Sequence, residues 1–235
     1  MTHSVVLDLD DTLYLERDYV ASGFAALSDW LIAHRGVKDF GETAWRIWEA
    51  GERRHVFDRA FASLGVVAEP GLIDRAVAIY RAHAPVISLQ PDAQRFLRSQ
   101  GVVRLALVTD GPAAAQRAKI AALGLERFGL DPIICTDEWG PAYWKPHRRA
   151  FEAIAQAHRA LNGRFVYVAD NPAKDFLAPR ALGWRTVQID RPGAVHPRTP
   201  PTDAHGADVR IASFDELTGA LLADLFEDRS LEQAL

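Results

Sequence analysis

The sequence has little of three features that would each assign a protein to a class at once. It holds one cysteine, Cys135, among 235 residues, which excludes an internal disulfide and favours a reducing compartment. Its apolar runs stay shorter than the roughly 18 residues of a membrane helix, and we expect neither a membrane span nor a signal peptide. The net charge is only −4, which argues against nucleic acid or an anionic membrane as partner. These absences predict a cytoplasmic protein.

Histidine also gives no signal for a metal site. The eight histidines are scattered along the chain and show no spacing typical of zinc ligands. The composition, 49% hydrophobic and 25% charged, is that of an ordinary globular protein with a sizeable core. A small anionic substrate stays compatible with the net charge, because a local site can oppose the global charge.

What the sequence does contain is a series of short apolar runs rich in β-branched residues. Between most of these runs lie stretches with helical periodicity. Near-continuous apolar strands that alternate with helices predict a doubly wound parallel sheet with helices on both faces, an α/β fold. The predicted strands are Ser4–Leu9, Arg104–Thr109, Pro132–Thr136, Arg164–Ala169, Arg185–Ile189 and, more weakly, Asp208–Ile211. The predicted helices between and after them are Asp92–Gln100, Ala113–Leu123, His147–Leu161, Ala173–Leu182 and Phe214–Phe226.

One long segment interrupts this alternation. Residues 14–89 show no convincing strand, and they predict an inserted α-helical cap domain. Residues 1–13 and 90–235 would then form the α/β core domain. The helices expected in the insertion are Arg17–Arg35, Phe40–Gly51, His55–Leu64 and Gly71–His83.

Polar residues gather where the predicted strands end. In a doubly wound sheet, ligands bind beyond the carboxyl ends of the strands, so we expect these residues to meet at one edge. Carboxylates so close would repel one another unless a cation lay between them, and their hard oxygens suit Mg²⁺. A hydroxyl, a lysine and the backbone N–H groups of turns suit a phosphoryl group. The residues are Asp8-Leu9-Asp10-Asp11-Thr12, Thr109-Asp110-Gly111, Lys145-Pro146 and Asp170-Asn171-Pro172-Ala173-Lys174-Asp175.

These four motifs, in this order, resemble those of the haloacid dehalogenase (HAD) superfamily in its phosphatase branch. The resemblance covers nearly the whole chain and implies the HAD-like Rossmannoid core with a helical cap. It implies that Asp8 is the nucleophile and a metal ligand. It also implies that Asp10 is the general acid and base and binds Mg²⁺ through its backbone carbonyl, with Asp170 as another ligand. One departure is Ala169, where many relatives have glycine.

The same resemblance assigns the remaining residues of the site. Thr109 and Lys145 would act in catalysis by holding the phosphate, together with Leu9, Asp110 and Gly111 of the turns. Asp175 and Asn171 would support the site, Asp175 by orienting Lys145 or a metal-bound water. We interpret Lys119 and Lys174 as surface charges of helices, and Tyr14 as a cap residue that could contact the leaving group.

The expected activity is hydrolysis of a small phosphorylated metabolite through an aspartyl-phosphate on Asp8. A phosphomutase of the same fold is an alternative, since it would use the same core residues. A 2-haloacid dehalogenase is another, although such enzymes lack the residue equivalent to Asp10. A response-regulator switch also uses Asp, Thr and Lys, but its acidic pair comes early and its acceptor lies on a later strand. The residues do not identify the substrate, and both a monomer and a homodimer agree with them.

Overall fold

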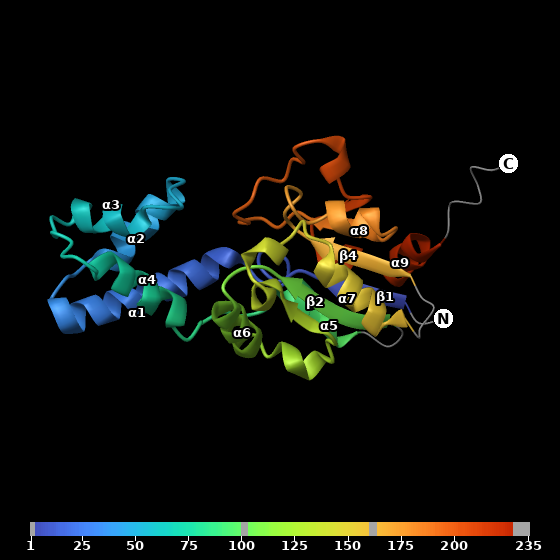
Figure 1. Ribbon diagram of the computed structural model, residues 1–235, viewed down its shortest axis with the longest axis horizontal. Coiled ribbons are helices and arrows are strands. Elements are labelled where there is room, and N and C mark those ends of the chain that lie inside the picture. The colour runs from blue at the N-terminus through green and yellow to red at the C-terminus, as the bar shows by residue number, and fades with distance from the viewer. Residues whose placement is uncertain (1–2, 100–102, 160–163, 228–235) are drawn as a thin grey trace. The chain divides into compact units, whose positions relative to one another are not determined.

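The computed structural model describes residues 3–99, 103–159 and 164–227, and one parallel sheet organises it (Figure 1). Six strands pair in the order β3-β2-β1-β4-β5-β6, so the predicted doubly wound α/β fold is confirmed. Each predicted strand is present, with ends that differ from the prediction by at most two residues. The strands are β1 (His3–Leu7), β2 (Val103–Thr109), β3 (Ile133–Cys135), β4 (Phe165–Ala169), β5 (Arg185–Ile189) and β6 (Val209–Ile211).

The register of the central strands determines where their carboxyl ends lie relative to one another. Leu7 of β1 lies opposite Leu107 of β2 on one side and Val168 of β4 on the other. The three strands therefore end within two residues of one another, at the point where the strand order reverses. This is where ligands bind in open α/β sheets.

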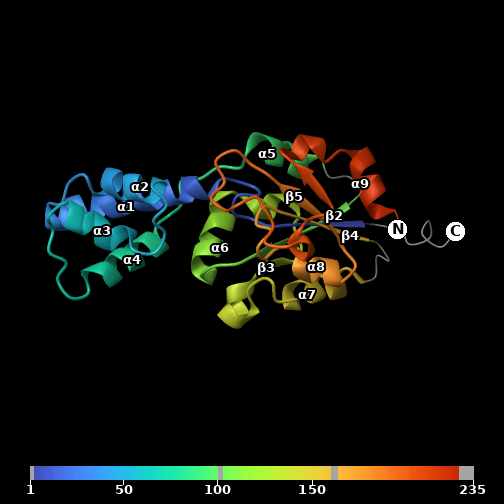
Figure 2. The same ribbon diagram turned by 90° about the horizontal axis from the view of Figure 1, so that it is seen from above.

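Helices cover both faces of the sheet, and this explains why its strands are apolar throughout. Figure 2 shows α5 (Pro91–Arg98) and α9 (Gly219–Phe226) over one face and α7 (Arg149–Ala157) and α8 (Leu177–Ala181) over the other. On the second face, Phe151 and Ile154 of α7 belong to one buried cluster with Val6, Val108 and Tyr167 of the strands. Helix α6 (Ala113–Ala122) connects β2 to β3. No helix among the described residues has the length and apolar character to cross a bilayer.

Four helices follow β1 and precede α5 in the chain (Figure 1). They form one compact unit, Arg17–Ile87, and the rest of the chain, Met1–Glu16 with Ser88–Leu235, forms the other. Aromatic rings fill the helical unit, where the Phe40 ring lies tilted against that of Phe61 and Phe57 meets Tyr80 edge-on. The helices are α1 (Glu16–Arg35), α2 (Phe40–Glu49), α3 (Val56–Ser63) and α4 (Leu72–Ala82).

Three predicted helices differ from the observed ones by more than two residues. The helix expected over His147–Leu161 covers only Arg149–Ala157, with His158 as its C-cap. The helix expected over Ala173–Leu182 begins only at Leu177, because the preceding residues form a turn closed by the Asp175 side chain. The helix expected over Phe214–Phe226 is split: a 3₁₀ turn, Phe214–Glu216, ends before Thr218, whose hydroxyl caps α9 by accepting from the Leu221 N–H (3.2 Å). The predicted helix ends at Gln100 and Leu161 lie outside the described residues.

The places where the chain leaves and re-enters the α/β unit are bound together. The Leu13 carbonyl accepts a hydrogen bond from the Gln90 N–H (2.9 Å). Beside it, the buried Arg191 guanidinium donates to the Thr12 carbonyl (2.7 Å) and to both oxygens of Asp92 (3.1 Å each). We name this set of contacts the Arg191 clamp. Because a buried ion pair with several hydrogen bonds has a defined geometry, the clamp fixes the turn that follows β1.

Candidate active site

The predicted site residues meet at the carboxyl edge of the sheet. Asp8 follows β1 directly, and its N–H donates to the Val168 carbonyl of β4 (2.9 Å). Thr109 is the last residue of β2, and Asp170 follows β4. Lys145 comes from the connection that leads into α7. All four side chains are buried.

Lys145 is the centre of the first group of contacts. Its ammonium lies 2.6 Å from Asp8 Oδ1 and 2.7 Å from Asp175 Oδ1, and it donates to the Tyr167 hydroxyl at 3.1 Å. Burial lowers the pKa of Lys145, but the Asp175 and Asp8 carboxylates raise it by more, to well above its usual range. Lys145 is therefore a fixed cation against the predicted nucleophile. Together with Asp170, we name these residues the Asp8 cluster (Asp8, Lys145, Asp170, Asp175).

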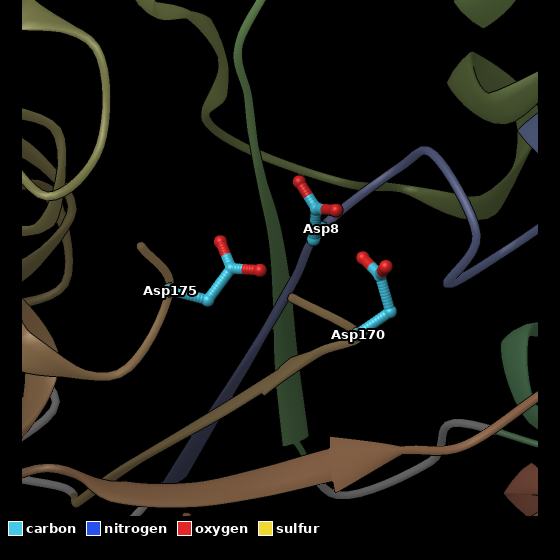
Figure 3. Close-up of side chains that lie close together, drawn as sticks. All are labelled: Asp8, Asp170 and Asp175. Carbon is cyan, nitrogen blue, oxygen red and sulfur yellow. The ribbon is translucent and has the colours of Figure 1, made fainter. Parts of the chain in front are cut away.

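The Asp8 cluster holds three carboxylates and one cation, Lys145. Figure 3 shows the three carboxylate side chains close together. One oxygen from each of Asp8, Asp170 and Asp175 lies within 4.8 Å of the others. Burial raises the pKa of Asp8 to about 7 against the opposing effect of Lys145. Burial, with the Asp175 and Asp8 carboxylates, raises the pKa of Asp170 well above its usual range. This imbalance fits a site that takes up a further cation.

One oxygen atom of Asp170 also supports a cation site here. Asp170 Oδ2 is buried and has no hydrogen-bond partner among the described residues. A buried carboxylate oxygen left unpaired is unfavourable, and a hard divalent cation would satisfy it. Asp175 is placed differently, because its Oδ2 accepts the Asn171 N–H (2.9 Å) while its Oδ1 contacts Lys145. Its carboxylate is thus shared between a turn and the lysine, which leaves Asp8 and Asp170 with oxygens for a metal.

Asp10 lies in a second group of contacts, which the sequence interpretation missed. Its Oδ1 contacts the Lys119 ammonium (2.7 Å) and accepts from the Tyr14 hydroxyl, and its Oδ2 accepts from the Gln116 amide (2.8 Å). Burial raises the pKa of Asp10, but Lys119 and the hydrogen bonds from Tyr14 and Gln116 together lower it by more, so the net shift is downward. We name these residues the Asp10 cluster (Asp10, Tyr14, Gln116, Lys119).

Two interpretations of these residues from the sequence were wrong. Lys119 is not a surface charge: its side chain is 8% exposed and points to Asp10. Tyr14 lies in the α/β unit, is fully buried and contacts Asp10. The spacing of Gln116 and Lys119, three residues apart on the helix that follows Thr109, was the signal that could have identified them.

The turns after the strands are held by side-chain hydrogen bonds. Thr109 accepts from the Gln116 amide (2.7 Å). Gly111 has a φ of +117°, a backbone conformation that residues other than glycine rarely adopt. The Leu9 carbonyl accepts from the Leu13 N–H (2.9 Å), which closes the turn after β1. Asn171 Oδ1 accepts from the Ala173 N–H (3.0 Å), so this side chain shapes the turn after Asp170.

A small cavity of about 20 Å³ opens between the two clusters. It brings two further side chains to the site, Lys174 and His196. Lys174, interpreted above as a surface charge, pairs with Asp110 Oδ2 (3.1 Å). His196 comes from a proline-rich loop with no periodicity and lies 3.6 Å from Glu16, so no sequence pattern indicated it. The cavity is lined by Asp8, Asp10, Thr109, Asp110, Asp170, Lys174 and His196.

Comparison with known proteins places this arrangement in a family. Residues 2–183 match the model of the haloacid dehalogenase-like hydrolases. The chain is 28% identical over 201 residues to the glyceraldehyde 3-phosphate phosphatase of Methanocaldococcus jannaschii, an alignment that covers 80% of this chain and 85% of the relative.

Solved structures show the same fold. A HAD family hydrolase from Deinococcus radiodurans R1, with bound phosphate and sodium, superimposes with a TM-score of 0.63 at 23% identity, over 96% of this chain and 97% of that one. The 2-haloacid dehalogenase of Pseudomonas syringae pv. Tomato DC3000 gives a TM-score of 0.63 at 22% identity, over 95% and 99%. With the family match over most of its length and its motif residues at one sheet edge, the chain belongs to the haloacid dehalogenase-like hydrolases.

Proposed function

We propose that this hydrolase is a Mg²⁺-dependent phosphomonoesterase that acts on a small phosphorylated metabolite. The observation that carries the proposal is the Asp10 cluster: a second carboxylate, with its own hydrogen-bond partners, at the edge of the cavity that Asp8 also lines. Displacement of a halide needs a nucleophile but no group that protonates an alcohol. The phosphatase activity named for the 28% identical relative supports the same choice.

Asp8 and Asp170 are the proposed side-chain ligands of Mg²⁺, with the Asp10 backbone carbonyl as a third ligand. The unpaired Asp170 oxygen and the excess of carboxylates support this set. When bound, the ion would neutralise the carboxylates and draw charge from the phosphoryl oxygens. Thr109 and Lys145 lie beside Asp8 and are proposed to act on the same phosphoryl group.

The proposed first step is attack of a carboxylate oxygen of Asp8 on phosphorus. A P–O bond to Asp8 forms while the bond to the leaving alcohol breaks, and Asp10 gives that alcohol its proton. In the second step Asp10 takes a proton from water, which attacks the same phosphorus. The bond to Asp8 then breaks, so that inorganic phosphate leaves and Asp8 is again a carboxylate.

Asp10 must therefore carry a proton when the first step begins and be ionised when the second begins. In its contacts with Lys119, Gln116 and Tyr14 it is ionised, which suits the second step. A dianionic phosphate ester in the cavity would repel that carboxylate and raise its pKa, because like charges favour the protonated form. The approach of substrate thus prepares Asp10 to act as the acid.

The test is phosphate release from a panel of metabolite phosphates, with and without Mg²⁺. We expect Asp8→Asn to lower kcat by about 10⁴-fold or more, because it removes the nucleophile. Asp10→Asn should lower kcat by about 10²–10⁴-fold, the range for loss of a general acid. Asp58→Asn, at an exposed position of α3, is the matched control and should behave as wild type.

Three results would replace the proposal with another. Near wild-type turnover by Asp8→Asn would show that Asp8 is not the nucleophile. Chloride release from a 2-chloroacid without added metal would identify a dehalogenase. Isomerisation of a sugar phosphate without net phosphate release would identify a phosphomutase. The cytoplasmic location and the monomer or homodimer state stay predictions.

A further inference from the structure

The hydrogen-bonding capacity of Lys145 raises a question about how the proposed substrate is held. A lysine ammonium has three N–H donors. In Lys145 these have three protein acceptors, Asp8 (2.6 Å), Asp175 (2.7 Å) and Tyr167 (3.1 Å), and the side chain is 0% exposed. Lys145 can therefore orient Asp8 and act through its charge, but each of its hydrogens is already engaged.

Lys174 is the second lysine of the cavity, and its donors are less committed. It lines the cavity together with Asp8 and Thr109, and its side chain is 32% exposed. Within the described parts of the chain, its ammonium has one acceptor, Asp110 Oδ2 at 3.1 Å. Two of its three hydrogens are thus available to a ligand in the cavity.

The position and charge of Lys174 are both built into the site. Its partner Asp110 is itself fixed, because Asp110 Oδ1 accepts from the Thr136 hydroxyl (2.7 Å) and the Lys145 N–H (3.1 Å). Burial and the charge of Lys145 lower the pKa of Lys174, but the nearby carboxylates raise it by more, so the residue is a cation at neutral pH. A tethered cation at the wall of an anion site is suited to bind phosphoryl oxygens.

We propose that Lys174 is a second phosphate-binding lysine, which donates to the non-bridging oxygens of the group that Asp8 attacks. Lys145 then orients the nucleophile, and Lys174 makes the direct contact. This inference rests on the phosphatase function proposed above and adds a catalytic residue to it. Lys119, the third lysine near the site, is 8% exposed, is occupied by Asp10 and does not line the cavity.

The test is the binding of inorganic phosphate in the presence of Mg²⁺, measured by isothermal titration calorimetry, which requires no turnover. We expect Lys174→Met to weaken phosphate binding about 10–100-fold, the value of one or two charge-assisted hydrogen bonds. Lys174→Arg should keep most of the affinity, since it retains the charge and the donors. Lys38→Met, at an exposed position of the helical unit, is the matched control.

A second measurement distinguishes direct binding of phosphate by Lys174 from a purely structural role of this residue. If Lys174 contacts phosphate, Lys174→Met should also weaken inhibition of ester hydrolysis by inorganic phosphate to the same degree. Wild-type phosphate affinity in Lys174→Met would overturn the inference, even if kcat fell, because the residue would then act only through Asp110. If Lys174→Met does not fold by circular dichroism, Lys174→Gln takes its place, with the same expected loss.

The experiments distinguish failure of the proposed phosphatase function from failure of the proposed role of Lys174. A wild-type protein that hydrolyses phosphate esters, with a Lys174→Met variant that binds phosphate normally, contradicts only the role of Lys174. A wild-type protein that neither hydrolyses phosphate esters nor binds phosphate contradicts both.

Discussion

Asp8 and Asp10 are two residues apart, but their surroundings shift their pKa values in opposite directions. Burial raises the pKa of Asp8 to about 7, because Lys145, which Asp8 shares with Asp175, offsets that effect only in part. Asp10 pairs with Lys119 and accepts from two neutral donors, Tyr14 and Gln116, and together these contacts lower its pKa in spite of its burial. The two clusters show how one short turn can present a group that requires more positive charge next to one that is already neutralised.

The largest difference between the clusters should appear when each loses its lysine. Lys145→Met leaves Asp8 and Asp175 buried without their cation, which should lower the free energy of unfolding by about 3–5 kcal/mol. It should also lower kcat by about 10³-fold, because Asp8 loses its orientation. Urea unfolding and phosphate release measure the two effects. A stability loss below about 1 kcal/mol, as for an exposed ion pair, would contradict the central place of Lys145.

A smaller effect, of opposite sign, is expected from Asp170→Asn in metal-free protein. The pKa of Asp170 is higher in the folded than in the unfolded chain, so its ionisation opposes folding as the pH rises above about 4. The amide removes that penalty. At pH 7.5 in EDTA the variant should melt about 3–6 °C higher than wild type, which corresponds to roughly 1–2 kcal/mol.

The same variant should lose the stabilisation that Mg²⁺ gives to wild type, since a proposed ligand is gone. Thermal melting at pH 4 and pH 7.5, with and without Mg²⁺, checks both statements. The gain should become small toward pH 4, where Asp170 is protonated in the folded chain and about half protonated in the unfolded chain. An equal gain at both pH values would indicate a packing effect instead.

The smallest effect is expected in the Asp10 cluster. Lys119→Met should lower kcat about 10-fold, within the range for a mispositioned general acid. Because Lys119 lowers the pKa of Asp10, its loss should move the acidic limb of the kcat profile to higher pH. Lys119→Arg should restore both properties. A pH profile that does not change in Lys119→Met would mean that Lys119 has no electrostatic effect on Asp10.

The sequence was sufficient for the features that depend on local patterns. Apolar runs that stop at an acid predicted the strands, and the parallel topology then placed Asp8, Thr109 and Asp170 at one edge. The helix of Ala173–Leu182 was placed too early because its helical periodicity was visible, whereas the use of Asp175 to close the turn was not. The break before Thr218 was missed for a similar reason, since a capping hydroxyl inside an apolar run looks like an ordinary polar position.

The partners of Asp10 and the place of Lys174 in the cavity could not be predicted from the sequence. Lys119 and Lys174 have the sequence context of surface charges, and only the packing of their helix or turn against the strand ends decides otherwise. His196 lies in a loop whose path has no periodic signal. A prediction from sequence identifies the groups that perform chemistry more easily than the groups that hold them in place.

The Arg191 clamp has a consequence for how such a chain can change over time. Leu13 and Gln90 are bound to each other, and Arg191 holds Thr12 and Asp92 on either side of that junction. Everything between them, including the whole helical unit Arg17–Ile87, is therefore an insertion whose two ends are already closed by the host. Insertions with adjacent, anchored ends are exchangeable at small entropic cost. The sheet edge that carries Asp8 can in this way stay unchanged while the inserted unit is remodelled, lengthened or replaced.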